Sequence, residues 1–401
     1  MAMKKQIKNL QMRLLPPSSR SFHGATYDIR QDIQHIRQEL AALQDQMARH
    51  TEQMHHRMDS LSSDIAIHDA HMKLYNDVFF RKDEETPHEM RKRFFRSLPG
   101  ADEPFRTFQL ANAKLLHRLE DICREQHLDY WLWVGSLVGA ASRSGPIPWD
   151  DDIDICMMRE DVMKLYDLLK SDPEYQITLV YDYYAFVKQF RFSHRDSNIP
   201  CFIDVSLWDW AADASEGNEL RLKELRHQLV DSLPECRSGL SFWRDNPYLF
   251  APGSGFVVQC GPVNPDSQNP ELAEAEIERI ENYYRNFHRK AVDAGILCSR
   301  EDASAVAFGL ENYSEDAPWR RFIWPKEMIF PTQEIMFEQK PSRAPNDISG
   351  FCDECYPGWP YLPKDILGHD HVAPFDLGRE VFQDAHDTGA LRTVAVRRDG
   401  Q

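Results

Sequence analysis

The sequence lacks the basic charge that nucleic-acid binding demands. Its 401 residues hold 47 Lys and Arg against 64 Asp and Glu, a formal net charge of −17. Proteins that hold a phosphate backbone need a local excess of Lys and Arg, so this composition argues against a nucleic-acid partner. A nucleotide substrate is still compatible with it, because a bound cation can hold the phosphates locally.

Long apolar runs are also missing. The longest apolar stretch, residues 131–141, is far shorter than the roughly eighteen apolar residues that a membrane-spanning helix needs. Residues 1–16 contain no apolar core of the kind found in a secretory signal. We therefore expect a cytoplasmic location, with contact at most to the inner surface of the membrane.

Cysteine is sparse. The eight cysteines do not have the density of a disulfide framework, which favours a reducing compartment. Cys352 and Cys355 form the one close pair in the sequence. A zinc site needs two more ligands and no second close pair supplies them, so ordinary helix-face cysteines are the preferred interpretation.

Two stretches near the N-terminus have helical spacing. Residues 1–20 form a basic amphipathic segment, which fits either a weak contact with an anionic membrane surface or a frayed terminus. Within 27–75, apolar residues recur at alternating steps of four and three, as in the seam of a coiled coil. We expect a homo-oligomer joined through this coiled coil. A long helix packed on its own domain is the alternative.

The rest of the chain has the pattern of one large domain. We expect a linker at 76–104, a catalytic domain at 105–375 and a polar tail at 376–401. Apolar periodicity predicts helices at 108–126, 159–169, 219–229 and 272–294. Strands are expected at 153–157, 176–181, 185–192 and 201–207. The irregular stretch 234–270 has the length of a cleft-forming loop, and Pro345-Asn346-Asp347 is expected to cap a helix.

An acidic motif, PWDDDIDI at 148–155, stands directly before an apolar strand. Side chains alternate along a strand, so Asp152 and Asp154 are expected on the same face. Carboxylates this close repel one another unless a cation or a proton compensates them, and carboxylate oxygens are ligands of hard divalent ions. A solvated acidic loop is the alternative. Asp150 and Asp151 are secondary candidates for the same site.

Upstream of the acids, WLWVGS at 131–136 has the pattern of an apolar strand that ends in a Gly-Ser turn. The backbone N–H groups of Gly135 and Ser136, before a helix, are suited to hold a phosphate, with the Ser136 hydroxyl as a further donor. A cation site beside a phosphate site is the machinery of phosphoryl or nucleotidyl transfer.

A third acid lies within the apolar run CFIDVSLWD at 201–209. A carboxylate in the middle of such a strand is costly without a partner, so a third metal ligand is the preferred role for Asp204. A buried Asp held by a backbone N–H or by an Arg is the alternative. Asp209 is the second choice as ligand. Lys188 and Arg191, on the preceding strand, either bind phosphate at this site or face solvent.

GSLVGA at 135–140, Arg143 and GPIPWDDDIDI at 145–155 together resemble the LicD family. That family includes bacterial phosphocholine transferases and the catalytic domains of fukutin and fukutin-related protein. It belongs to the nucleotidyltransferase-fold superfamily, whose signature is Gly-Ser followed by an Asp-x-Asp pair. The resemblance implies an α+β fold with a nucleotidyltransferase-like mixed sheet flanked by helices, here preceded by the N-terminal coiled coil.

The resemblance also implies a reaction. Asp152, Asp154 and Asp204 would hold Mg²⁺ or Mn²⁺, Asp204 would also act as the base, and Arg143 and Lys188 would clamp charge. The donor would be a CDP-activated alcohol such as CDP-choline, and CMP would leave. The acceptor would be a hydroxyl of a cell-surface glycan, in lipopolysaccharide or capsule. A glycosyltransferase that holds a nucleotide-sugar through Asp-x-Asp is the alternative, and a non-catalytic assembly protein is a third interpretation.

Overall fold

A computed structural model describes residues 79–101, 105–182, 188–196, 198–238, 257–260, 274–312, 321–356 and 358–361, together with His71 and Glu103. The chain divides into two compact units, 1–85 and 86–401, and the helices and strands below belong to the second. The expected amphipathic segment at 1–20 and the tail at 376–401 lie outside the described residues. Of the expected coiled coil at 27–75, only His71 is described.

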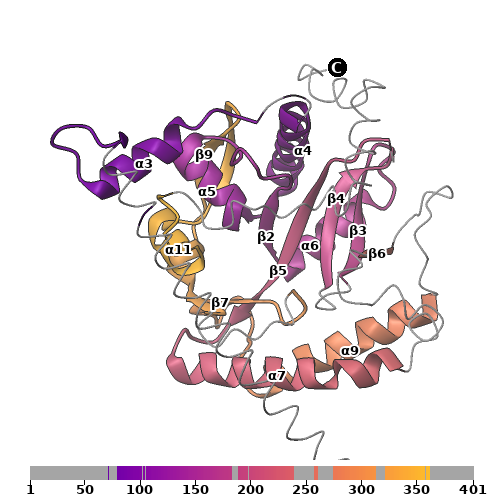
Figure 1. The fold of residues 1–401 in the computed structure, drawn as a ribbon. Coiled ribbons are helices and arrows are strands. Elements are labelled where there is room, and N and C mark those ends of the chain that lie inside the picture. The colour runs from indigo at the N-terminus through magenta and orange to yellow at the C-terminus, as the bar shows by residue number, and fades with distance from the viewer. Residues whose placement is uncertain are drawn as a thin grey trace, which may run out of the picture. The chain divides into compact units, whose positions relative to one another are not determined.

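The strand β5 (Phe202–Ala211) is the centre of the fold, and all ten of its residues are buried. On one edge it pairs in parallel with β2 (Asp154–Met158). On the other edge, β4 (Lys188–His194) pairs with its first half and β7 (Ala305–Phe308) with its second half, both antiparallel. Figure 1 shows β5 as the long strand that crosses the domain.

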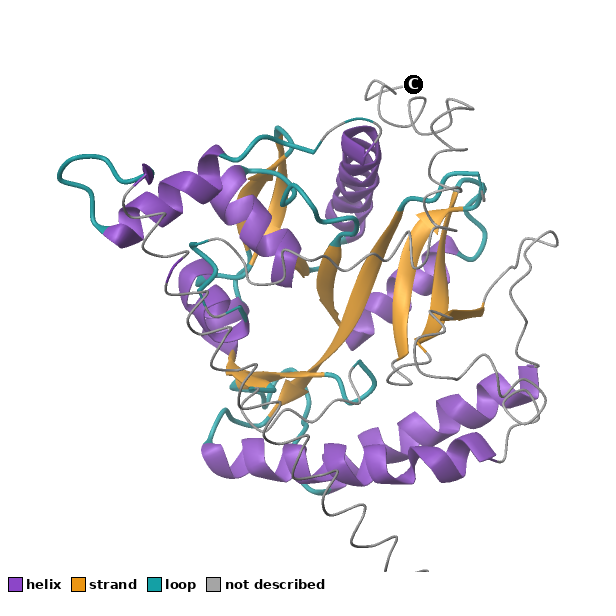
Figure 2. Cartoon of the chain, viewed as in Figure 1, coloured by secondary structure: helices purple, strands orange, loops and turns teal. Residues whose placement is uncertain are grey.

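Four further strands complete this sheet. β1 (Tyr130–Leu132) pairs with β2, β3 (Tyr175–Asp182) with β4, β6 (Val257–Cys260) with β3, and β8 (Ile323–Pro325) with β7. Parallel and antiparallel pairs therefore share one sheet of eight strands. A separate hairpin joins β9 (Gln333–Phe337) to β10 (Lys340–Ala344). With helices around the sheet (Figure 2), the expected mixed α+β class is confirmed.

The helices are α4 (Phe105–Gln126), α5 (Val134–Arg143), α6 (Arg159–Leu169), α7 (Glu216–Ser238), α9 (Glu274–Asp293), α10 (Lys326–Ile329) and α11 (Ile348–Cys355), preceded by α3. The four helices predicted from apolar periodicity lie close to their expected positions, at α4, α6, α7 and α9. The helix expected at 159–169 is α6, with the same bounds. Asp347 caps α11, as expected, because its side chain accepts from the backbone N–H of Gly350. The helices α7 and α9 lie side by side (Figure 1).

The helix α3 (Pro87–Ser97) lies within the stretch 76–104 that the sequence suggested as a linker. Thr86 caps it through a reciprocal capping box with Glu89, and Pro87 occupies the first turn, where its missing N–H costs nothing. Phe95 is fully buried in the core of the second unit. The second compact unit thus includes α3.

The core contains a block of aromatic side chains, which includes Trp208 on the same strand, β5, as Asp204. Trp208 of β5 contacts the rings of Trp131, Trp133 and Trp324 at centroid distances of 4.8–5.5 Å. Such tilted and edge-to-face contacts add to the energy of burial. This block fixes β1, β5 and β8 against one another and so gives the acidic residues a rigid base.

None of the helices within the described ranges is long and apolar enough to cross a bilayer.

Candidate metal site

The structure brings Asp152, Asp154 and Asp204 together. One carboxylate oxygen of each lies within 4.8 Å of those of the other two, and among the described residues they form the one such group of acids. Asp152 and Asp204 are 6 % and 5 % exposed, and Asp154 is half-buried. The ligands of one Mg²⁺ or Ca²⁺ ion lie about 2.0–2.6 Å from it, hence up to about 5 Å from each other. The three side chains therefore fit a single divalent cation.

Strand register explains why two of the acids meet. Asp154 of β2 and Asp204 of β5 are direct partners across a parallel pair, so their side chains leave the same face of the sheet. The backbone N–H of Asp204 donates to Ile153 O over 2.9 Å. Fifty residues of sequence thus separate two side chains that the sheet places next to each other.

A cation continues the row of register partners that runs across β2, β5 and β4. Arg191 of β4 is the register partner of Asp204 on its other side. Its Nε and Nη2 donate to the two oxygens of Asp204 over 2.8 and 3.1 Å. The guanidinium carbon also lies 3.8 Å from the ring centroid of Phe202. The Arg191 side chain therefore faces the acids rather than solvent.

The start of α5 adjoins the acidic row. Gly135 and Ser136 lie in the first turn of this helix, directly after β1 and the cap residue Trp133. The backbone N–H of Asp154 donates to Ser136 Oγ over 2.9 Å, and the N–H of Trp133 donates to Asp154 O over 3.0 Å. Both backbone polar groups of Asp154 are therefore tied to the beginning of α5.

Backbone conformation at this helix start is unusual. Val134, the first residue of α5, has φ of +34°, a region that β-branched residues rarely adopt. No side chain of the cap residue Trp133 bonds to the first-turn N–H groups. Orphan N–H groups at a helix start attract anions. The sequence predicted a phosphate-binding turn here, and the structure replaces the turn with the helix itself.

The acidic loop packs closely against Gly135. A Cβ atom added at this position would lie 2.7 Å from Asp150 Oδ2, closer than such atoms approach. One turn later, a Cβ at Gly139 would lie 2.5 Å from the backbone oxygen of Gly145. The two glycines let the loop that leads to the acids lie directly against α5.

Two amide side chains of α4, which sequence reasoning missed, hold the acidic loop from the other side. Gln109 Nε2 donates to Ile147 O and Asp150 O, each over 2.9 Å. Asn112 Nδ2 donates to Asp151 O over 3.2 Å, while its Oδ1 accepts from the N–H of Phe202. Asn112 thus joins the acidic loop to the beginning of β5. The sequence feature that could have revealed them is the presence of two amide side chains on the buried face of an amphipathic helix.

The remaining candidates have other positions. Asp150 adjoins Gly135 and Asp151 is buried, but neither belongs to the group of three acids. Arg143 donates to Phe95 O and Leu98 O over 3.0 and 2.8 Å, so it fastens α3 to α5. Burial lowers the pKa of its guanidinium. Lys188 begins β4, and its side chain lies outside what the structure describes.

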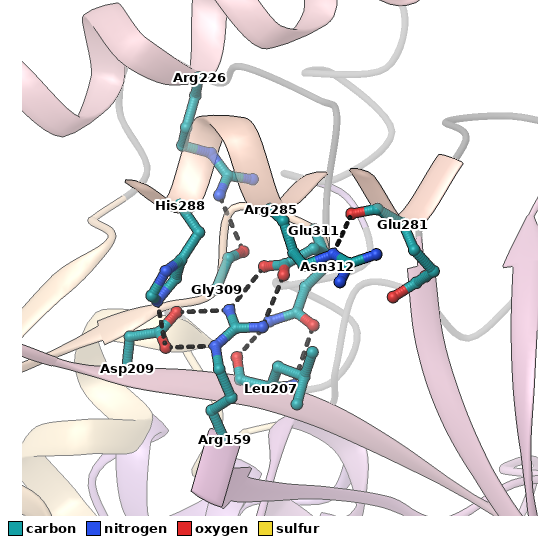
Figure 3. Close-up of polar contacts among 10 residues, drawn as sticks. All are labelled: Arg159, Leu207, Asp209, Arg226, Glu281, Arg285, His288, Gly309, Glu311 and Asn312. Atoms are coloured by element: carbon teal, nitrogen blue, oxygen red, sulfur yellow. Dashed lines mark hydrogen bonds and ion pairs between the residues drawn. The ribbon is translucent and has the colours of Figure 1, made fainter. Parts of the chain in front are cut away.

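Asp209, the second choice as ligand, has a different role. It lies five positions after Asp204, an odd step along the strand, so its side chain leaves the opposite face of β5. Arg159 donates to both oxygens of Asp209 over 2.6 and 2.7 Å and to both oxygens of Glu311 over 2.6 and 2.8 Å. His288 Nε2 lies 3.2 Å from Asp209 Oδ1. Figure 3 shows the guanidinium between the two carboxylates.

This second group of charges is structural. Burial alone would raise the pKa of Asp209, but the charge of Arg159 and its hydrogen bonds hold it well below the ordinary value. The same two acids raise the pKa of Arg159 above its usual range, against the effect of burial. The group joins the start of α6 to β5, to α9 and to the segment after β7. Arg159 occupies the oxygens that a metal ion would need.

Known proteins resemble the part of the chain that holds the site. Residues 127–225 match the family described as LicD/FKTN/FKRP, nucleotidyltransferase domain. The chain is 37% identical over 60 residues to the lipopolysaccharide cholinephosphotransferase LicD of Haemophilus influenzae, which is 15% of this chain and 23% of that protein. It is 28% identical over 88 residues to an uncharacterized protein of Rickettsia prowazekii, 20% of this chain and 33% of that protein. Each aligned segment thus spans a third or less of the relative's length.

Proposed function

Because residues 127–225 place this chain in the LicD family, we propose that it transfers a phospho-alcohol from a CDP-activated donor to a hydroxyl of a cell-surface glycan. One observation carries the proposal: a cluster of three carboxylates stands beside a helix start that is tied to it by the hydrogen bond from Asp154 to Ser136. The acids suit a cation and the helix start suits a phosphate. A donor with a diphosphate needs both at once.

The chain's own residues have distinct tasks in this reaction. Asp152, Asp154 and Asp204 would hold a divalent ion, Mg²⁺ or Mn²⁺, which would neutralise charge on the phosphate oxygens. The N–H groups at the start of α5, near Gly135 and Ser136, orient the phosphate. The acceptor oxygen attacks the phosphorus that carries the alcohol, and the bond to the CMP phosphate breaks.

The proton of the acceptor hydroxyl needs a base. Asp204 is the candidate because it belongs to the group of acids that would hold the metal ion. Both of its oxygens accept hydrogen bonds from Arg191, so proton transfer to Asp204 requires this pair to open or to loosen. Lys188 stays a candidate for binding phosphate on sequence grounds. Arg143 is assigned no step, because its guanidinium bonds to the end of α3.

The alcohol and the glycan follow from resemblance. The relative from Haemophilus influenzae is named as a lipopolysaccharide cholinephosphotransferase, so phosphocholine and lipopolysaccharide are the first candidates, with capsule as a second acceptor. We also propose that the chain forms a homo-oligomer through 27–75, works in the cytoplasm and contacts the membrane peripherally. A glycan acceptor carried on a lipid would fit such a location.

Product analysis tests the reaction. The protein is incubated with CDP-choline, Mg²⁺ and deacylated lipopolysaccharide, and ³¹P NMR follows the phosphorus signals. The proposal predicts release of CMP and a new phosphodiester signal, both lost without Mg²⁺ and in Asp152→Asn. The hypothesis of phospho-alcohol transfer is rejected if no CDP-alcohol yields CMP while a UDP-sugar yields UDP.

That second outcome would favour the runner-up, a glycosyltransferase that binds its nucleotide-sugar through Asp-x-Asp. The same carboxylates would serve it. The position of Gly135 and Ser136 in the first turn of α5, bonded to Asp154, supports the transfer of a phospho-alcohol instead. A purely structural role for the chain predicts that neither nucleotide is consumed.

A further inference from the structure

Arg191 binds the same carboxylate, that of Asp204, that a bound cation would need. Both of its contacts to Asp204 are short, at 2.8 and 3.1 Å, and they engage both carboxylate oxygens. Asp204 is also one of the three acids that fit a divalent ion. The side chain of Arg191 is 18 % exposed and that of Asp204 is 6 % exposed, so water screens this pair only weakly.

A divalent ion and this guanidinium therefore compete. If the ion binds all three acids, it either shares Asp204 with Arg191 or displaces it. In both cases two positive groups lie near one carboxylate and repel each other. Arg191 thus weakens cation binding as long as no other anion is present.

Arg191 has a second support that does not depend on Asp204. Its guanidinium stacks over Phe202, at 3.8 Å from the ring centroid. Phe202 and Asp204 are two residues apart on β5, so their side chains leave the same face. The guanidinium can therefore turn from the carboxylate to another anion while it stays on the ring, and a phosphate matches its fork of donors as well as a carboxylate does.

We propose that Arg191 couples cation binding to donor binding. Arg191 serves as the internal counter-ion of Asp204 until the donor diphosphate replaces Asp204 as the partner of the guanidinium. In the free protein Arg191 holds Asp204 and keeps the cation site weak. The diphosphate then draws the guanidinium away, and the cation gains the third carboxylate. This inference rests on the proposed function and adds that the cation and the nucleotide bind cooperatively. Cooperativity between two ligands is reciprocal, so each tightens the binding of the other by the same factor.

Mn²⁺ binding, followed by electron paramagnetic resonance of the free ion, tests the coupling without any turnover. We expect Arg191→Met to bind Mn²⁺ more tightly than wild type in the absence of nucleotide, by on the order of tenfold, a typical size for coupling between two sites. CDP should tighten Mn²⁺ binding in wild type and have a smaller effect in Arg191→Met. A residue with a merely structural role would not produce tighter binding when it is removed.

Two controls accompany the measurement. Arg195→Met removes the same charge from a guanidinium that bonds to Asp172 O and Leu169 O, and it should leave the Mn²⁺ affinity unchanged. Asp154→Asn should abolish Mn²⁺ binding both in the otherwise wild-type protein and in Arg191→Met. If Arg191→Met does not fold, as judged by its melting curve, Arg191→Lys decides the question. Lysine cannot grip both oxygens of Asp204, so tighter Mn²⁺ binding than in wild type supports the proposal.

Equal or weaker Mn²⁺ binding in the folded Arg191 variants overturns the coupling. If that binding is still lost in Asp154→Asn, the metal site and the proposed function survive. If wild type and the Arg191 variants all fail to bind Mn²⁺, with and without CDP, the coupling and the metal-dependent function are rejected together.

Discussion

Ser136 accepts a hydrogen bond from the backbone N–H of Asp154 across 2.9 Å and so joins the first turn of α5 to the start of β2. Ser136 is 2 % exposed, and water reaches this contact poorly. The hydroxyl that sequence reasoning offered as a phosphate donor therefore also acts as an acceptor that positions a metal ligand.

Replacement of this hydroxyl should weaken the site. In Ser136→Ala the N–H of Asp154 loses its acceptor, and an unsatisfied buried donor costs about 1–3 kcal/mol. We expect a lower free energy of unfolding in urea and weaker Mn²⁺ binding. The control is Ser142→Ala on the same helix, whose hydroxyl donates to Val138 O within α5. Equal Mn²⁺ affinity in both variants would contradict the positioning role.

A methyl group at Gly135 should disturb the acidic loop more than the fold. The new Cβ would lie 2.7 Å from Asp150 Oδ2, so the Asp150 side chain must move. We expect Gly135→Ala to lose donor and Mn²⁺ affinity with a change of less than about 2 kcal/mol in stability, because a short side chain can rotate away.

Gly217→Ala is the matched control for this substitution. Gly217 lies in the first turn of α7, and a Cβ there meets nothing within 4 Å. Alanine should be neutral or slightly stabilising, since glycine disfavours helix. If Gly135→Ala behaves like Gly217→Ala in Mn²⁺ titrations, the close packing of the loop on α5 has no functional weight.

Asn112 should matter to the site although it carries no charge. Asn112→Ala removes the donor to Asp151 O and the acceptor for the N–H of Phe202, both buried. We expect a loss of about 1–3 kcal/mol in the free energy of unfolding, together with weaker Mn²⁺ binding.

Asn218→Ala separates these two effects. Asn218 is also buried, and its amide donates to Asp213 O and Ile296 O, which belong neither to the metal site nor to the acidic loop at 148–155. It should lose similar stability and keep its Mn²⁺ affinity. A parallel loss of affinity in both variants would mean that general destabilisation, rather than the loop contact, weakens the site.

Sequence reasoning reached Asp152 and Asp154 because their acidic run stands directly before an apolar strand, and it reached Asp204 because that carboxylate lies inside an apolar run. It also reached β5, whose run of buried residues is hard to mistake. It kept Asp209 as the second choice for the ligand role of Asp204, although strand alternation already puts Asp204 and Asp209 on opposite faces of β5. Asp209 could therefore have been excluded as a partner of Asp152 and Asp154 from the sequence alone.

Other features depend on contacts between distant parts of the chain. Nothing in the sequence near Arg143 reveals that α3 ends beside it, because α3 lies in a charged stretch with the composition of a linker. The pairing of Arg191 with Asp204 likewise depends on strand order, which places β4 and β2 on either side of β5. Local pattern gives the elements, whereas register and strand order decide which side chains meet.

The charge group around Arg159 should contribute to stability rather than to activity. Arg159→Met would leave Asp209 and Glu311 without their shared partner, and the loss of one member of a buried ion pair costs about 3–5 kcal/mol. Urea unfolding at neutral pH measures this loss. Mn²⁺ affinity of the folded fraction should be unchanged, because Asp209 lies on the face of β5 opposite the acids.

Acid should reveal the contribution of Asp209. Its pKa is lowered in the folded protein, so its carboxylate stabilises the fold above the unfolded value near 4 and this contribution is lost as the pH falls below about 4. Wild type should therefore be more stable than Asp209→Asn at pH 5, where typical carboxylates are ionised. The difference should shrink below about pH 4, and a difference that does not vary with pH would contradict the assignment.

The most direct test of the account is a set of thermal melts of wild type and Asp152→Ala. The protein is heated with CDP-choline, CDP-glycerol, CDP-ribitol or UDP-sugars, each with and without Mg²⁺. A ligand that binds the folded state raises the melting temperature according to its concentration and affinity. The account predicts a rise with a CDP-alcohol that requires Mg²⁺ and is absent in Asp152→Ala. A rise only with a UDP-sugar, or one that persists in Asp152→Ala, would contradict it.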